Sequence, residues 1–225
     1  MNLEGAMPAI LDQRVWFPDP ARTDANGLVA IGGDFSPERL LAAYRAGIFP
    51  WSVKLITWWS PDPRGVLELE DFHISQSLAK FLRKNVYEVT MDRAFRAVVS
   101  ACAVPDPKRG DTWITEEFIA AYTRLHELGH AHSVECWQDG KVVGGIYGVA
   151  VGGLFAGESM FHRADNASKV VLCRLVEHLR TQGFGLFDVQ MVTAATRPFG
   201  ARAVPRAKYL ERLKGVVGMK CVFNG

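Results

Sequence analysis

Two carboxylates in this sequence come directly after apolar runs. Residues 142–157 carry no charged side chain, and Glu158 follows them. Asp188 ends a second apolar run, and Gln190 lies two positions beyond it. A buried carboxylate with a shifted pKa can orient an amine or take up its proton, which makes these residues candidates for catalysis. A carboxylate at the end of a strand can equally cap or pair locally, so both interpretations of Glu158 stay open at this point.

A possible metal motif occurs at His126-Glu127-Leu128-Gly129-His130. It spells H-E-x-x-H, in which both histidines of a zinc peptidase face one side of a helix and the glutamate activates water. Gly129, however, is typical of a residue that ends a helix, and Cys136 stands where the extended motif has its third histidine. We therefore expect no metal site, and a zinc metallopeptidase is kept as the alternative function.

Two other families of motif are incomplete. Ser159 lies in half of a G-x-S-x-G elbow, but Phe161 replaces the second glycine and no histidine follows His178 to complete a triad. The glycine clusters match neither a phosphate-binding P-loop nor a dinucleotide-binding loop. We expect no cofactor.

The elements that position these residues can be predicted from residue patterns. Runs of β-branched and aromatic residues on both sides of Gly152-Gly153 predict a hairpin whose second strand ends at Glu158. Capping residues and apolar periodicity predict helices at residues 37–46, 75–84, 92–102, 115–129, 166–182 and 206–214. They predict strands at residues 15–17, 28–31, 66–69, 87–90, 133–137 and 184–190. This alternation indicates a mixed, partly antiparallel α/β sheet with helices packed on it.

Composition is that of an ordinary globular protein. The chain has 225 residues, of which 48% are hydrophobic and 22% are charged. It shows no apolar run of the ~20 residues that cross a membrane and no secretory signal, so we expect a cytoplasmic protein. The four cysteines are far apart, which predicts reduced thiols without a disulfide framework or a zinc knuckle.

Charge and aromatic residues suggest a nucleic-acid partner. The net charge is only +2, but residues 197–220 contain seven Lys or Arg and the single acid Glu211. A basic tail suits a polyanion, although it can also be a solvated helix. Trp51, Trp58 and Trp59 lie among prolines, with Arg64 nearby. Rigid aromatics beside cations can stack on nucleobases, although such clusters often fill a core.

Several blocks of this sequence together resemble the leucyl/phenylalanyl-tRNA–protein transferase family, over about residues 15 to 213. The blocks are Ile31-Gly32-Gly33-Asp34, Gly47-Ile48-Phe49-Pro50-Trp51, Trp58-Trp59-Ser60-Pro61-Asp62-Pro63-Arg64, Thr112-Trp113-Ile114, His132-Ser133-Val134-Glu135, Gly157-Glu158-Ser159-Met160-Phe161, Ala167-Ser168-Lys169 and Asp188-Val189-Gln190. Val189 stands where the family has cysteine, and residues 195–201 depart from the family's polar loop.

The resemblance implies a small N-terminal domain, residues 1–63, and a C-terminal domain of acetyltransferase-like (GNAT) fold, residues 64–225. It implies an aminoacyltransferase that moves Leu or Phe, and less readily Met, from aminoacyl-tRNA to the N-terminal Arg or Lys of an acceptor protein. The product is marked for degradation by the N-degron pathway. We expect a monomer.

The resemblance also implies roles for individual residues. Asp188, Gln190 and Glu158 are the expected catalytic residues, and Trp51 and Trp113 are expected to hold the terminal adenosine. The expected aminoacyl pocket consists of Ile146, Phe155, Leu172, Leu175, Leu179 and Phe187. The residues expected to bind tRNA are Arg83, Lys84, Arg202, Arg206 and Lys208.

Overall fold

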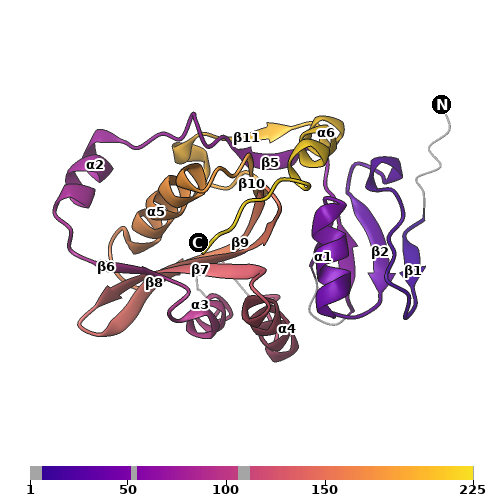
Figure 1. The fold of residues 1–225 in the computed structure, drawn as a ribbon, viewed down its shortest axis with the longest axis horizontal. Coiled ribbons are helices and arrows are strands. Elements are labelled where there is room, and N and C mark those ends of the chain that lie inside the picture. The colour runs from indigo at the N-terminus through magenta and orange to yellow at the C-terminus, as the bar shows by residue number, and fades with distance from the viewer. Residues whose placement is uncertain (1–6, 52–54, 106–111, 225) are drawn as a thin grey trace.

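A computed structural model describes residues 7–51, 55–105 and 112–224 of the chain. Two β-sheets lie beside each other along its length (Figure 1). The smaller sheet has the strand order β1-β2-β4-β3. Its strands are β1 (Ala9–Leu11), β2 (Leu28–Gly32), β3 (Phe49–Pro50) and β4 (Thr57–Trp59). Helix α1 (Pro37–Arg45) follows β2, and a 3-10 turn, η1 (Pro20–Arg22), precedes it.

The larger sheet has seven strands in the order β11-β5-β10-β9-β8-β7-β6. The strands are β5 (Arg64–Leu67), β6 (Glu88–Met91), β7 (Ala131–Gln138), β8 (Lys141–Val151), β9 (Leu154–His162), β10 (Leu186–Gln190) and β11 (Ala201–Val204). Neighbouring strands are antiparallel except β9 and β10, which pair in parallel. The mixed α/β class expected from the sequence is therefore confirmed.

Helices cover both faces of the larger sheet (Figure 1). They are α2 (Gln76–Arg83), α3 (Phe95–Cys102), α4 (Glu116–Glu127), α5 (Ala167–Thr181) and α6 (Arg206–Val216), with a 3-10 turn η2 (Arg197–Phe199). Side chains alternate along β8, so that Ile146 belongs to the core under α5 while Tyr147 belongs to the core under α3 and α4. None of these helices, within the described ranges, is long and apolar enough to cross a membrane.

The core is continuous between the two sheets. Tyr44 of α1 and Trp58 of β4 belong to the same buried cluster as Phe118 and Tyr122 of α4. Arg206, at the start of α6, is 6% exposed and donates hydrogen bonds to the carbonyl groups of Asp24, Ser60 and Thr23. The proposed boundary near residue 63 falls between β4 and β5, but packing crosses it at several places.

Three sequence predictions of elements are wrong. The second strand of the hairpin does not end at Glu158, because β9 continues to His162 after a bulge at that residue. The other two are wrong for local reasons. Residues 15–17 are not a strand, because Asp12 binds the backbone and side chain of Arg14 in a turn and Phe17 packs edge-on against Trp58. Asp92 does not cap a helix. Its carboxylate instead accepts a hydrogen bond from the Ser133 backbone at 2.8 Å, and helix α3 starts three residues later.

Candidate active site

Asp188 is buried in a complete set of hydrogen bonds. Its side chain is paired with Arg64 at 2.9 Å (Nε to Oδ1) and 2.6 Å (Nη2 to Oδ2). The Tyr209 hydroxyl donates to Oδ2 at 2.8 Å, and the Gln190 backbone N–H donates to Oδ1 at 2.8 Å. The residue is 0% exposed. Asp188 therefore holds other groups in place and has no oxygen left for a substrate.

Arg64 completes this buried pair. Its guanidinium lies between the rings of Phe49 and Tyr209, 4.7 and 4.5 Å from their centroids, and Nη1 donates to the Gly47 carbonyl at 3.0 Å. Burial of a charge is costly unless the charge is paired and hydrogen-bonded. The two aromatic faces and the Gly47 carbonyl group stabilise the parts of the guanidinium that do not contact Asp188. Arg64 thus connects β5 to the smaller sheet and to α6.

Glu158 is paired much less completely. Oε1 accepts hydrogen bonds from the Tyr44 hydroxyl at 2.7 Å and from Gln190 Nε2 at 2.9 Å. Oε2 is buried and has no partner among the described residues. The pKa of Glu158 is raised to about 8. Burial is the largest cause and the negative charge of Asp188 acts in the same direction, while the hydrogen bonds from Tyr44 and Gln190 and the charge of Arg64 lower the pKa.

Two β-bulges aim Glu158 and Gln190 at the same place. In the pairing of β8 with β9, Tyr147 lies opposite Ser159 and Gly148 opposite Gly157, which leaves Glu158 as an extra residue. The pairing of β10 with β5 shifts in the same way between Asp188 and Gln190, and Gln190 has a left-handed φ of 60°. Bulges redirect side chains, and a non-glycine residue in this conformation stores strain. The amide and the carboxylate meet because of these two irregularities.

Next to Glu158 lies an apolar cavity of about 540 Å³. Parallel pairing of β9 with β10 stops at Ala156 and Asp188, and the cavity lies beyond that point. Of the six residues expected to form an aminoacyl pocket, Ile146, Leu172 and Phe187 line it. Phe155, Leu175 and Leu179 belong to the core under α5 and are not among the residues that line the cavity.

Other cavity-lining residues were not predicted. They include Met160, Val189, Met191 and Thr193. The first two belong to the strands that diverge, and the last two to the segment after β10. Of these residues, only Met160 could have been suggested by the sequence, because it lies close to Glu158. The path of the segment after β10 depends on the bulge, so Met191 and Thr193 could not be placed.

The two tryptophans expected at the adenosine lie outside the residues that line this cavity. Trp51 is 38% exposed and packs edge-on against Trp59, with ring centroids 5.9 Å apart. Trp113 is half-buried and packs edge-on against Phe118 at 4.8 Å. Phe118 stacks on Tyr122, whose hydroxyl is hydrogen-bonded to that of Tyr44. Trp113 is thus connected to Glu158 through packed rings.

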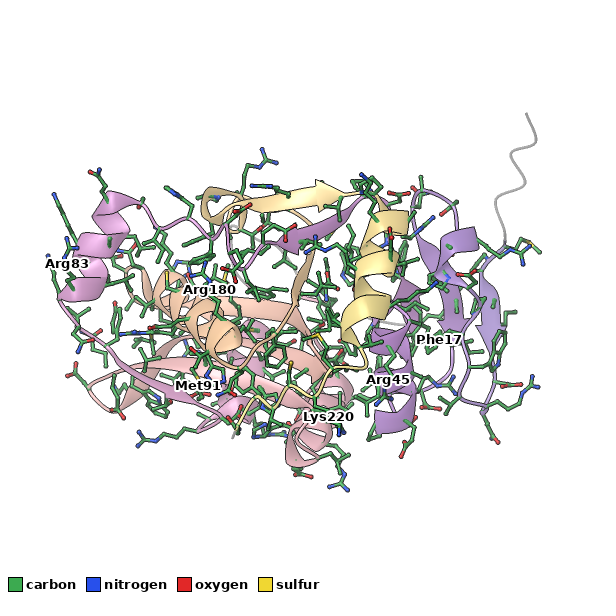
Figure 2. All side chains as sticks on the ribbon, turned by 45° about the horizontal axis from the view of Figure 1, so that its top comes forward. Phe17, Arg45, Arg83, Met91, Arg180 and Lys220 are labelled. Atoms are coloured by element: carbon green, nitrogen blue, oxygen red, sulfur yellow. The ribbon has the colours of Figure 1, made fainter. Side chains whose placement is uncertain are left out.

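The residues expected to bind tRNA are spread over the molecule. Arg83 and Lys84 are exposed on and after α2. Arg83 lies at the end of the molecule far from Phe17 (Figure 2). Lys208 is exposed on α6, and Arg202 pairs with Asp71 at 3.0 Å. The structure corrects the expectation for Arg206, because its guanidinium is buried on backbone carbonyl groups and cannot reach a nucleic acid.

The H-E-x-x-H motif does not have metal-site geometry. Helix α4 ends at Glu127, and Gly129 takes a left-handed φ of 77°, so His126 and His130 do not share a helical face. Glu127 pairs with Arg124 at 2.9 Å on the surface. Nothing in this arrangement supports the metallopeptidase alternative.

Comparison with known proteins identifies close relatives. A family model described as "Leucyl/phenylalanyl-tRNA protein transferase" matches residues 66–214, and the model of its N-terminal domain matches residues 33–62. Proteins named leucyl/phenylalanyl-tRNA–protein transferase are 55% identical in Pseudomonas syringae pv. syringae, over 86% of this chain and 87% of the relative, and 53% identical in Nitrosomonas europaea, over 87% and 84%. Among solved structures, a ribosomal-protein-alanine N-acetyltransferase from Brucella melitensis biovar Abortus 2308 is 10% identical over 50% of this chain and 84% of its own, with a TM-score of 0.36.

Proposed function

The chain belongs to the leucyl/phenylalanyl-tRNA–protein transferase family, and we propose that the apolar cavity beside Glu158 is where it transfers leucine or phenylalanine from tRNA to a protein. The observation that carries this proposal is the buried, unpartnered Oε2 of Glu158 at the wall of that cavity. An oxygen of this kind is available to a group that arrives with the substrate.

The reaction joins an amine to an ester that is already activated. The α-amine nitrogen of the acceptor attacks the carbonyl carbon of the aminoacyl ester, a C–N bond forms, and the C–O bond to the terminal ribose breaks. The amine gives up a proton and the ribose oxygen gains one. Because an α-amine has a pKa of roughly 7.7–8.0, a useful fraction is uncharged at neutral pH and orientation matters more than a strong base.

We assign Glu158 to the amine. In its ionised form, Glu158 accepts a hydrogen bond from the incoming nitrogen at Oε2, while Gln190 and Tyr44 hold Oε1. With a pKa of about 8, Glu158 is well matched to exchange a proton with that amine. Asp188 is a positioning residue, because its contact with the Gln190 backbone fixes the bulge that aims the Gln190 amide at Glu158.

The lining of the cavity supports the transfer of large apolar amino acids. Ile146, Leu172 and Phe187 offer aliphatic and aromatic surface, and burial of a Leu or Phe side chain contributes about 1.5–3 kcal/mol. One methylene group changes binding by only ~1–3 kcal/mol, so Met enters less readily but is not excluded. The same proposal includes acceptors with an N-terminal Arg or Lys and the degradation signal that results from transfer. It also includes a cytoplasmic monomer and binding of the terminal adenosine by Trp51 and Trp113.

A single-turnover assay tests the proposal. Phe-tRNA or Leu-tRNA is incubated with the protein and a peptide that begins with Arg, and formation of the new peptide bond is followed. Glu158→Gln and Gln190→Ala are each expected to lower the rate by about 100-fold or more. The matched control is Glu177→Gln, which removes an exposed carboxylate on α5 that pairs with Arg174. Wild-type rates in Glu158→Gln, or transfer from neither tRNA by the wild type, would contradict the proposal.

A further inference from the structure

The last described residues of the chain form a strap along the larger sheet. Residues 218–224 belong to no helix or strand, and they lead from the end of α6 to the start of β7. The end marked C in Figure 1 lies beside β7 and β9. Although this segment has no regular structure, the side chain of Phe223 is only 2% exposed. The strap therefore inserts one aromatic ring into the core under α5.

Phe223 is held by contacts of its ring and of its carbonyl group. The ring stacks on His132 of β7 with centroids 4.2 Å apart, and His178 Nε2 of α5 donates to the Phe223 carbonyl oxygen at 2.7 Å. The next residue, Asn224, donates a side-chain hydrogen bond to Asp92. A strand, a helix and a loop thus fix one ring in a single position.

The ring of Phe223 lies behind the wall of the apolar cavity. It packs on Phe155 with ring centroids 5.6 Å apart, and Phe155 packs edge-on against Phe187 at 5.7 Å. Phe187 lines the cavity beside Glu158. Because Phe155 is buried in a close-packed core, it cannot shift without displacing a neighbouring group. Phe223 therefore supports the cavity wall through Phe155.

Two glycines confine the same rings from the strands. A Cβ atom added at Gly148 would lie 2.5 Å from the ring of Phe155, and one added at Gly157 would lie 2.9 Å from the ring of Phe187. Carbon atoms in favourable contact are about 3.5–4.0 Å apart, so both rings pack directly on the backbone. The side toward Phe223 is therefore where a smaller residue would give these rings room.

We propose that Phe223 is a positioning residue that sets how large a side chain the aminoacyl cavity accepts. The inference rests on the proposed function, because it requires the transferred side chain to enter this cavity. Phe223 is not among the residues that line the cavity, and it acts through Phe155 and Phe187, whose positions fix the depth of the cavity. Removal of a buried ring leaves a void into which its neighbours partly relax.

Donor selectivity tests this role. One tRNA is charged with Leu, Phe or Trp, and transfer to a peptide with N-terminal Arg is measured for each. In Phe223→Ala the cavity deepens, so kcat/KM for Trp relative to that for Leu is expected to rise about ten-fold. Phe223→Leu keeps most of the apolar volume and is expected to change this ratio less than about three-fold. The ratio compares donors on one protein, so loss of folded protein does not change it.

A matched control separates this effect from damage to the core in general. Leu11 is buried on β1, the outer strand of the smaller sheet (Figure 1). Leu11→Ala also leaves a void in a core, and we expect it to keep the wild-type ratio. A double variant tests the route: Phe155→Ala with Phe223→Ala is expected to shift the ratio no further than Phe155→Ala alone.

Three results would contradict the proposal. The first is a wild-type ratio in Phe223→Ala, with transfer of all three amino acids reduced by the same factor. The second is a double variant whose shift is the sum of the two single shifts. If Phe223→Ala does not fold, Phe223→Val is measured against the same criterion. The third is a wild type that transfers none of the three amino acids, in which case the proposed function fails and the inference fails with it.

Discussion

Two buried carboxylates lie on neighbouring strands of this protein and differ in how completely they are paired. Asp188 accepts hydrogen bonds from a guanidinium, a hydroxyl and a backbone amide, and it uses both oxygens. Glu158 uses one oxygen, and the other is buried and has no partner in the part of the chain that the structure describes. A carboxylate with a full set of partners stabilises a structure, whereas one with an open oxygen can act on a ligand. The comparison separates positioning from chemistry within one site.

The difference also shows how the two residues depend on each other. Asp188 fixes the Gln190 backbone, and the Gln190 side chain reaches Glu158. The negative charge of Asp188 contributes to the raised pKa of Glu158, while Arg64 opposes that effect. A change at the fully paired carboxylate therefore affects both stability and activity, whereas a change at Glu158 should affect activity far more.

Loss of Arg64 is expected to have the largest effect on stability. Arg64→Ala leaves Asp188 buried with a negative charge and no cation, which destabilises a protein by about 3–5 kcal/mol. The free energy of unfolding is measured in urea. Arg212→Ala is the control, because Arg212 makes a similar two-bond pair with Glu68 but the two side chains are 35% and 26% exposed. We expect a loss below about 1 kcal/mol. Equal losses in the two variants would show that burial does not distinguish these pairs.

The contribution of Glu158 to the stability of the folded protein should depend on pH in the opposite sense to that of a carboxylate whose pKa is lowered by folding. Its pKa is about 8 in the folded protein and its ordinary value is 4.5, so the folded state holds a proton that the unfolded state releases. The contribution is fully present below about pH 4.5 and is lost as the pH rises through 8. Glu158→Gln is neutral at every pH, so its stability relative to wild type should increase across that range.

Thermal unfolding at several pH values tests this expectation. The measured quantity is the difference between Glu158→Gln and the wild type, which cancels the titration of other groups. Asp34, Glu68 and Asp92 have lowered pKa values, and their contributions are lost at acidic pH in both proteins. A difference that stays constant from pH 5 to 8 would mean that Glu158 is charged in the folded protein.

The sequence predicts the regular elements better than the site. The helix at residues 37–46 was predictable because Pro37 at its start and Gly47 after its end act locally, although the side chain of Ser36 makes no capping bond. The hairpin was predictable from Gly152-Gly153. The two bulges were not predictable, because each depends on how one strand pairs with another. Glu158 and Gln190 were therefore identified only as positions, and their contact became visible in the fold.

The directions of individual side chains were the second feature that the sequence did not predict. Phe155 precedes the cavity-lining residues 157–160 on the same strand, and Leu175 and Leu179 lie one and two turns from Leu172, so the sequence could not say which would face the cavity. Arg206 looked like part of a basic tail because charge is counted along the chain. In the fold it is enclosed by carbonyl groups from three loop residues. Side-chain direction decided each of these cases.

The smallest expected effect comes from a single hydroxyl. Tyr44→Phe removes the donor to Glu158 Oε1 and should cost about 0.5–1.5 kcal/mol of unfolding free energy. Because that hydrogen bond lowers the pKa of Glu158, its loss should move the pH at which the Glu158 contribution disappears to a higher value. Tyr87→Phe removes a hydroxyl that donates to the Asp165 carbonyl at 2.8 Å and should leave that pH unchanged. If Tyr44→Phe also leaves it unchanged, the hydroxyl contributes to packing only, and Gln190 alone holds the reactive carboxylate.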